Sequence, residues 1–136
     1  MRGDDGSASL ELVLITPVLI LLLLLVVSVG RLEQARGDVD RAARDAARAA
    51  SIARSSDAAQ SEGEAAARST LQEGSVTCRA LRVAVNVDDF APGGSVGATV
   101  TCDVDLADVA LLGVPGHRTL TADFNEPVDA YRGATP

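Results

Sequence analysis

An uncharged apolar run near the N-terminus limits most strongly what this chain can fold into. Residues 12–29 contain two polar side chains, Thr16 and Ser28, and no charged one. As an α-helix this run would be about 27 Å long, close to the roughly 30 Å hydrocarbon core of a bilayer. The sequence therefore predicts a transmembrane helix over residues 7–30, in contact with membrane lipid, with a kink at Pro17.

A cleaved secretory signal peptide is the alternative interpretation of this segment. Such a peptide has a basic start, a shorter apolar region and small residues at its exit. Here the chain begins Met-Arg-Gly-Asp-Asp-Gly, which is more acidic than basic, and the apolar run is long. We therefore favour an anchor that stays in the mature protein.

The rest of the chain offers little material for a large hydrophobic core. Of the 136 residues, 47% are hydrophobic, but much of this fraction lies in the apolar run or is alanine; aromatic residues make up 2%. So lean a head would be marginally stable without a crosslink or a partner. The formal charge of −7 and the scarcity of aromatic rings argue against nucleic-acid binding.

A single acid, Glu11, directly precedes the apolar run, where a charge is costly unless it is paired. A cut between Gly6 and Ser7 would make Glu11 the fifth residue and create an α-amino group that is positive near neutral pH. Residues four apart on a helix share a face, so Glu11 could neutralise its own N-terminus or that of a neighbouring subunit. The alternative is that Glu11 is an ordinary interfacial charge beside an anchor.

The segment from Gly6 to Pro17, G-S-A-S-L-E-L-V-L-I-T-P, resembles the type IV prepilin processing signal, and with the helix that follows it is similar to the TadE-like family of tight-adherence pilus systems. The resemblance covers residues 1–50 well and the rest loosely. It implies a leader, residues 1–6, removed by a prepilin peptidase. It also implies that Glu11 acts in assembly with other pilin-like subunits and the inner assembly platform, as in a minor pilin or pseudopilin.

Beyond the span, small apolar residues recur at steps of three and four, which predicts an Ala/Arg-rich stalk helix over residues 31–60. The stripe consists of Leu32, Ala35, Val39, Ala42, Ala46, Ala49 and Ala53. It could pack against neighbouring subunits or against the protein's own strands. A capping-box pattern that begins at Ser61 predicts a second short helix, within residues 61–74, that stops at Gly74.

From residue 75 to 136 the apolar pattern changes to every second residue, which predicts a small antiparallel β head. Two strands are joined by a turn at residues 91–94, and a third covers residues 119–128 after a loop at residues 113–116. The predicted fold class is α+β: a long N-terminal helix followed by a small sheet. The same helix-on-sheet arrangement is what the pilin resemblance implies.

Cys78 and Cys102 fall on apolar-facing positions of the two predicted hairpin strands. A β-bulge at residues 79–81 would bring them into opposition. Two cysteines in a lean head outside the cytoplasm favour a disulfide, which would stabilise it by about 3 kcal/mol. The alternative is two buried free thiols.

No residue pattern predicts catalysis, a cofactor or a metal site. His117 is the single histidine and has no evident serine or cysteine partner. Asp103 and Asp105 alternate onto the outer face of a strand, and no calcium-loop spacing is present. Two classes of non-enzymatic protein remain: a pilin-like assembly component and a plain single-span anchored binding module. Only the first should depend on Gly6 and Glu11.

The arginine distribution conflicts with the topology that the resemblance implies. Arg2 alone precedes the span, whereas Arg31, Arg36 and Arg41 follow it, so the positive-inside rule would place the head in the cytoplasm. The cysteine pair prefers an oxidising compartment, and the resemblance requires a cytoplasmic leader. We therefore predict a single-pass protein of the cell membrane with a cytoplasmic N-terminus and an extracytoplasmic head.

Overall fold

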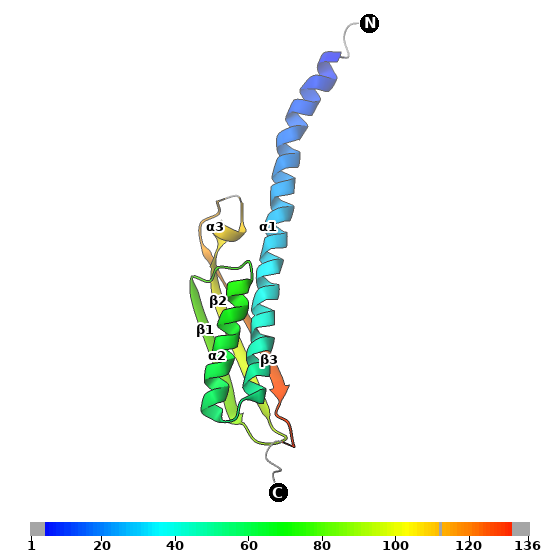
Figure 1. Cartoon of the computed structure of the whole chain (residues 1–136). Coiled ribbons are helices and arrows are strands. Elements are labelled where there is room, and N and C mark those ends of the chain that lie inside the picture. The colour runs from blue at the N-terminus through cyan, green and yellow to red at the C-terminus, as the bar shows by residue number, and fades with distance from the viewer. Residues whose placement is uncertain (1–4, 112, 132–136) are drawn as a thin grey trace.

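A long N-terminal helix and a small head make up the protein. The computed structural model describes residues 5–111 and 113–131, with side chains from residue 10 onward. The elements in chain order are α1 (Asp5–Ile52), α2 (Ser56–Glu73), β1 (Ala80–Asp89), β2 (Ser95–Asp105), α3 (Leu106–Val109) and β3 (His117–Pro127). The N-terminal part of α1 projects away from the head as a single rod (Figure 1). The predicted α+β class, with a long apolar helix before a small antiparallel sheet, is confirmed.

The sheet is an antiparallel meander in the order β1-β2-β3. Val83 pairs with Val100, and Ala98 pairs with Phe124, so alternate residues of each strand lie on the same face. The inner face of β2 is fully apolar and buried; its residues are Val96, Ala98, Val100, Cys102 and Val104. The predicted turn joins β1 to β2 with Gly93 at φ 82°, a conformation that glycine adopts without strain. The third strand also lies within two residues of its predicted position.

The β-bulge lies at the opposite end of the hairpin from the predicted one. Pairing near residues 79–81 is regular, with Leu81 opposite Cys102. The register shift falls instead between Asn86 and Asp89, next to the turn. There the Asn86 side-chain oxygen accepts a hydrogen bond from the Asp88 N–H at 2.9 Å. A short polar side chain that binds nearby backbone competes with ladder pairing, which explains the position.

Alanine allows α1 to lie close to two other elements at once. The head portion of α1 contacts α2 on one side and strands β2 and β3 on another. The buried hydrophobic residues of α1 are Ala35, Val39, Ala42, Ala43, Ala46, Ala47 and Ala50, and Ala53, directly after the helix, is also buried. Most of the predicted stripe therefore packs within the protein's own head, against α2 and the sheet. Both helices lie over one face of the sheet, with α2 over β1 (Figure 1).

The helix boundaries differ from the predicted stalk at residues 31–60 and the second helix at residues 61–74. The first helix ends at Ile52, and α2 begins at Ser56. The N-cap is Ser55, whose hydroxyl accepts a hydrogen bond from the Ala58 N–H at 3.2 Å. The Ser61 hydroxyl instead donates to the Ala58 carbonyl at 3.1 Å. The earlier cap prevailed because it also brings Ala59 into the buried helix–helix contact.

Gly74 ends α2, as predicted, but for a packing reason. Its φ of −73° is open to any residue. A Cβ at Gly74, however, would lie 2.8 Å from Asp38 Oδ2. That carboxylate accepts hydrogen bonds from the Ser75 N–H at 3.1 Å and from the Ser75 hydroxyl at 3.3 Å. Asp38 thus ties α1 to the segment that leaves α2.

Gly63 marks a close approach of α2 to both α1 and the sheet. A Cβ there would lie 2.9 Å from Val85 Cγ2 and 3.1 Å from the Ala46 carbonyl oxygen. We expect Gly63→Val to lower the free energy of unfolding by about 2 kcal/mol, because a branched side chain must push the helices apart. Gly37 is the matched control: it is also helical, and a Cβ there would meet nothing within 4 Å.

Denaturant unfolding of the detergent-solubilised full chain, followed by circular dichroism, measures this difference. Gly37→Val should leave the free energy of unfolding unchanged or raise it by a few tenths of a kcal/mol, since valine has the higher helix propensity. Equal effects at both positions would contradict the close packing at Gly63.

Candidate functional site

The apolar side chains in the N-terminal half of α1 are not covered by the rest of the protein. From Leu10 to Val29, the large hydrophobic side chains that point outward are 38–69% exposed. The most apolar 18-residue window of α1 has a mean hydropathy of 3.2 and is 6% buried, the reverse of a helix in a soluble core. By length and composition α1 can cross a bilayer. The helix indicates a single-pass membrane anchor.

The polar side chains inside the span bind their own backbone. The Thr16 hydroxyl donates to the Leu12 carbonyl at 2.7 Å, and the Ser28 hydroxyl donates to the Leu24 carbonyl at 2.7 Å. Such bonds to the residue four positions earlier allow hydroxyl groups to lie in hydrocarbon. The helix continues through Pro17, and α1 curves gently over its N-terminal half (Figure 1). A localised kink at Pro17 stays a prediction.

The predicted processing site lies in the first turns of α1. The helix begins at Asp5, so Gly6 and Ser7 are helical, and Glu11 follows Ser7 by one turn on the same face. The Glu11 side chain is exposed, next to the apolar surface of the span. The helical geometry thus meets the requirement for pairing between Glu11 and an α-amino group on Ser7. Cleavage itself stays a prediction.

The structure contains the predicted disulfide between Cys78 and Cys102, with the two Cα atoms 5.3 Å apart. Cys102 lies on the inner face of β2 and is fully buried. Cys78 was predicted to lie on a hairpin strand, but it precedes β1 by two residues. Its neighbour Arg79 donates its N–H to the Asp103 carbonyl at 2.7 Å, which holds this segment against β2. The disulfide therefore fastens the α2–β1 linker to the central strand.

The acidic residues of β2 are engaged by polar neighbours on the outer face of the sheet. Asp103 accepts a hydrogen bond from the Thr119 hydroxyl at 2.6 Å, and Asp105 lies 3.7 Å from the Arg79 guanidinium. His117 begins β3, opposite Asp105. Within residues 5–111 and 113–131, no three His, Cys, Asp or Glu side chains are grouped to hold a metal ion.

Three features of the head were not predicted from the sequence. The Asp45 carboxylate accepts a hydrogen bond from the Thr70 hydroxyl at 2.7 Å, which links α1 to α2. The Arg44 guanidinium lies 5.7 Å from the centre of the Phe124 ring, which links α1 to β3. The third is α3 with the connection that follows it, where only a loop was predicted. No local pattern along α1 predicts the Asp45 and Arg44 contacts, because their partners are distant in sequence.

An uncovered apolar helix joined to a disulfide-bonded helix-and-sheet head defines the class of the protein: a small, single-span anchored protein. The model of the TadE-like protein family matches residues 6–48. This match confirms the resemblance to the TadE-like family over the span and most of the stalk. It begins at Gly6 and ends before α2, so it covers neither α2 nor the sheet. No curated protein and no solved structure gives a significant match to the chain.

Proposed function

We propose that this protein is a minor pilin or pseudopilin of a tight-adherence-type pilus or secretion system. Its role would be structural and not enzymatic. A prepilin peptidase cuts between Gly6 and Ser7, and the mature subunit acts in pilus assembly. The observation that carries the proposal is the family match over residues 6–48, which begins at the proposed cut and includes Glu11 and the whole span.

The exposed surface of α1 supports an assembly role. Most of the alanine stripe is buried inside the head, so these side chains are not accessible to another subunit. Within the described side chains, the span from Leu10 to Val29 is the largest group of exposed apolar residues. Contacts with other pilin-like subunits would therefore be made by this half of α1, where Glu11 lies. The membrane-embedded assembly platform would meet the same surface.

The disulfide supports an extracytoplasmic head. Disulfides persist in oxidising compartments and are rare in the cytoplasm. Cys102 lies in the middle of the core, so the bond is part of the head's packing. A cytoplasmic N-terminus follows for a single span. This orientation runs against the arginines at positions 31, 36 and 41, and it places the Gly6–Ser7 bond on the side where a prepilin peptidase cuts.

Substitution of Gly6 tests the proposed processing. In cells that contain the cognate prepilin peptidase, we expect Gly6→Val to accumulate as a precursor, because a branched side chain replaces the residue before the cut. Intact-mass analysis of the membrane-extracted protein should show the wild type lighter by residues 1–6. Gly3→Val is the matched control in the same leader and should be cut normally.

The same measurement identifies the competing function. If the wild-type chain keeps residues 1–6 in the presence of the peptidase, and Gly6→Val keeps them too, the protein is a plain anchored binding module. A wild type cut at Ser7, with cutting lost in Gly6→Val alone, supports the proposal.

A further inference from the structure

The connection between β2 and β3 is unusually apolar for an exposed segment. Residues 106–116 carry one charged side chain, Asp108. Leu111 is 47% exposed and Val114 is 43% exposed. Within the described residues of the head, few other large hydrophobic side chains are as open to solvent. We call Leu111 and Val114 the apolar loop patch. Exposed apolar groups that gather in one place mark an interaction surface.

The fold fixes this connection beside α1. The Leu106 N–H donates to the Gly116 carbonyl at 2.9 Å, which closes the base of the connection. Val109, at the end of α3, packs partly on the core and lines a small cleft together with Arg31 and Ala35 of α1. The apolar loop patch begins two residues beyond Val109. Its position relative to α1 is therefore set by packing.

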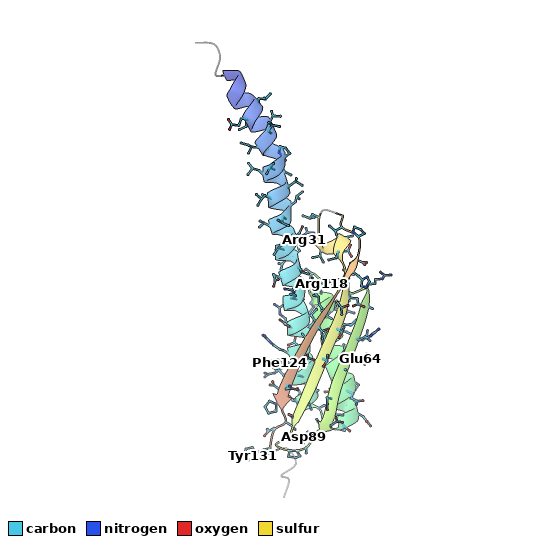
Figure 2. The ribbon with its side chains drawn as sticks, turned by 180° about the vertical axis from the view of Figure 1, so that it is seen from behind. Arg31, Glu64, Asp89, Arg118, Phe124 and Tyr131 are labelled. Atoms are coloured by element: carbon cyan, nitrogen blue, oxygen red, sulfur yellow. A yellow bond between two sulfur atoms is a disulfide. The ribbon has the colours of Figure 1, made fainter. Side chains whose placement is uncertain are left out.

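The patch lies at the end of the head from which the span emerges. Figure 1 shows α3 beside α1 at the point where the rod leaves the head. Figure 2 shows Arg31 level with α3, and Tyr131 and Asp89 at the far end of the head. Arg31 is the first charged residue after the apolar run, so the bilayer surface falls at this level. A membrane that receives the span would reach the apolar loop patch.

We propose that Leu111 and Val114 insert into the interfacial region of the bilayer leaflet from which the head emerges, as a second membrane contact beside the span. Interfacial segments bury apolar side chains at the boundary between headgroups and acyl chains, about 5–10 Å deep. Asp108 and Arg31 stay among the polar headgroups. The proposal requires the anchor but neither cleavage nor a particular orientation. The second contact would limit rotation and tilt of the head about α1.

A single introduced tryptophan can report the depth of the patch, because the chain contains no tryptophan. The probes are Leu111→Trp and Val114→Trp in the full chain, reconstituted into phosphatidylcholine vesicles with brominated acyl chains. The matched control is Ile52→Trp, since Ile52 is 63% exposed at the far end of α1. We expect emission from positions 111 and 114 to shift to shorter wavelength and to lose most of its intensity. Emission from position 52 should do neither.

A second pair of variants separates insertion from the affinity of tryptophan itself for interfaces. Added to Leu111→Trp, Val114→Asp should restore most of the quenched emission, whereas Ile52→Asp should not. Non-reducing mass analysis of Cys78–Cys102 and circular dichroism verify that each variant is folded.

Two results would overturn the proposal. Emission at positions 111 and 114 that is as unquenched as at position 52 would place the patch in water. A blue shift without bromine quenching, growing with the ratio of protein to lipid, would assign the patch to contact with a second copy of the chain.

Discussion

Replacing both cysteines with alanine is expected to lower the free energy of unfolding of the head by about 3.5 kcal/mol. Cys78 and Cys102 are 24 residues apart, so their bond removes the loop-closure entropy of that segment from the unfolded chain. Cys102 is also fully buried beside the alanines of α1, and its truncation adds a smaller packing loss. The disulfide is therefore a main source of the head's stability.

The effect is large because the rest of the core is small. The largest fully buried side chains are Val39, Val96, Val100, Val104 and Cys102. Small domains have a total stability of roughly 5–15 kcal/mol, so the loss would be a quarter or more of it. We expect the double variant to populate unfolded heads at growth temperature while the span stays helical.

Chemical denaturation under oxidising and reducing conditions measures the contribution. A thiol reductant should bring the wild type close to the stability of the double variant and leave the double variant unchanged. The reduced wild type retains the sulfur atoms, so it separates the crosslink from the packing loss. Equal midpoints for oxidised and reduced wild type would show that the bond does not stabilise the head.

The sequence identified the buried face of α1 but not what covers it. Ala35, Ala42 and Ala46 recur at helical spacing, and all are buried. A small side chain permits any close neighbour, whether a helix, a strand or another subunit, so the pattern cannot name one. In the structure the face is shared between two neighbours: α2, whose Gly63 and Ala67 are buried, and strands β2 and β3 of the sheet. Both contacts are tertiary and have no local signature.

Local patterns failed where two of them competed. The capping box at Ser61 is a valid start signal, but Ser55 also offers a cap six residues earlier, and burial decided between them. For the central strand β2, alternation was sufficient, because its inner face is buried along its whole length. The bulge depended on the side chain of Asn86, which no apolar pattern records. The position of α3 beside α1 depends on the full fold.

The predicted features of the N-terminal segment, in contrast, depend on residues that are close in sequence. The spacing of Gly6, Ser7 and Glu11 needs only a helix, and the structure supplies one from Asp5. Among the side chains that the structure describes, none forms an ion pair with Glu11. A carboxylate at the edge of an apolar span needs a positive charge nearby, and the proposed cut creates one.

Glu11→Gln is therefore expected to abolish assembly while leaving synthesis and cutting intact. Glutamine keeps the size of the side chain and removes its charge, so the α-amino group of Ser7, or of a neighbouring subunit, loses its partner in a low-dielectric setting. A loss of at least tenfold in assembled protein corresponds to about 1.4 kcal/mol per contact, which one pair at a membrane edge can supply. Crosslinking of membranes from cells with the complete assembly system measures the assembled fraction.

Glu33→Gln is the matched control, because Glu33 is on the same helix but outside the span. Its carboxylate pairs with Arg36 at 2.7 Å on the exposed surface, where such pairs contribute about 0–1 kcal/mol. Assembly should survive this change. If Glu11→Gln and Glu33→Gln assemble equally well, then Glu11 is an ordinary interfacial charge, and the proposed cut at Gly6 would not serve to create its partner. A defect confined to Glu11, with the mass of the mature chain unchanged apart from the substitution, would assign the pairing to assembly and separate it from processing.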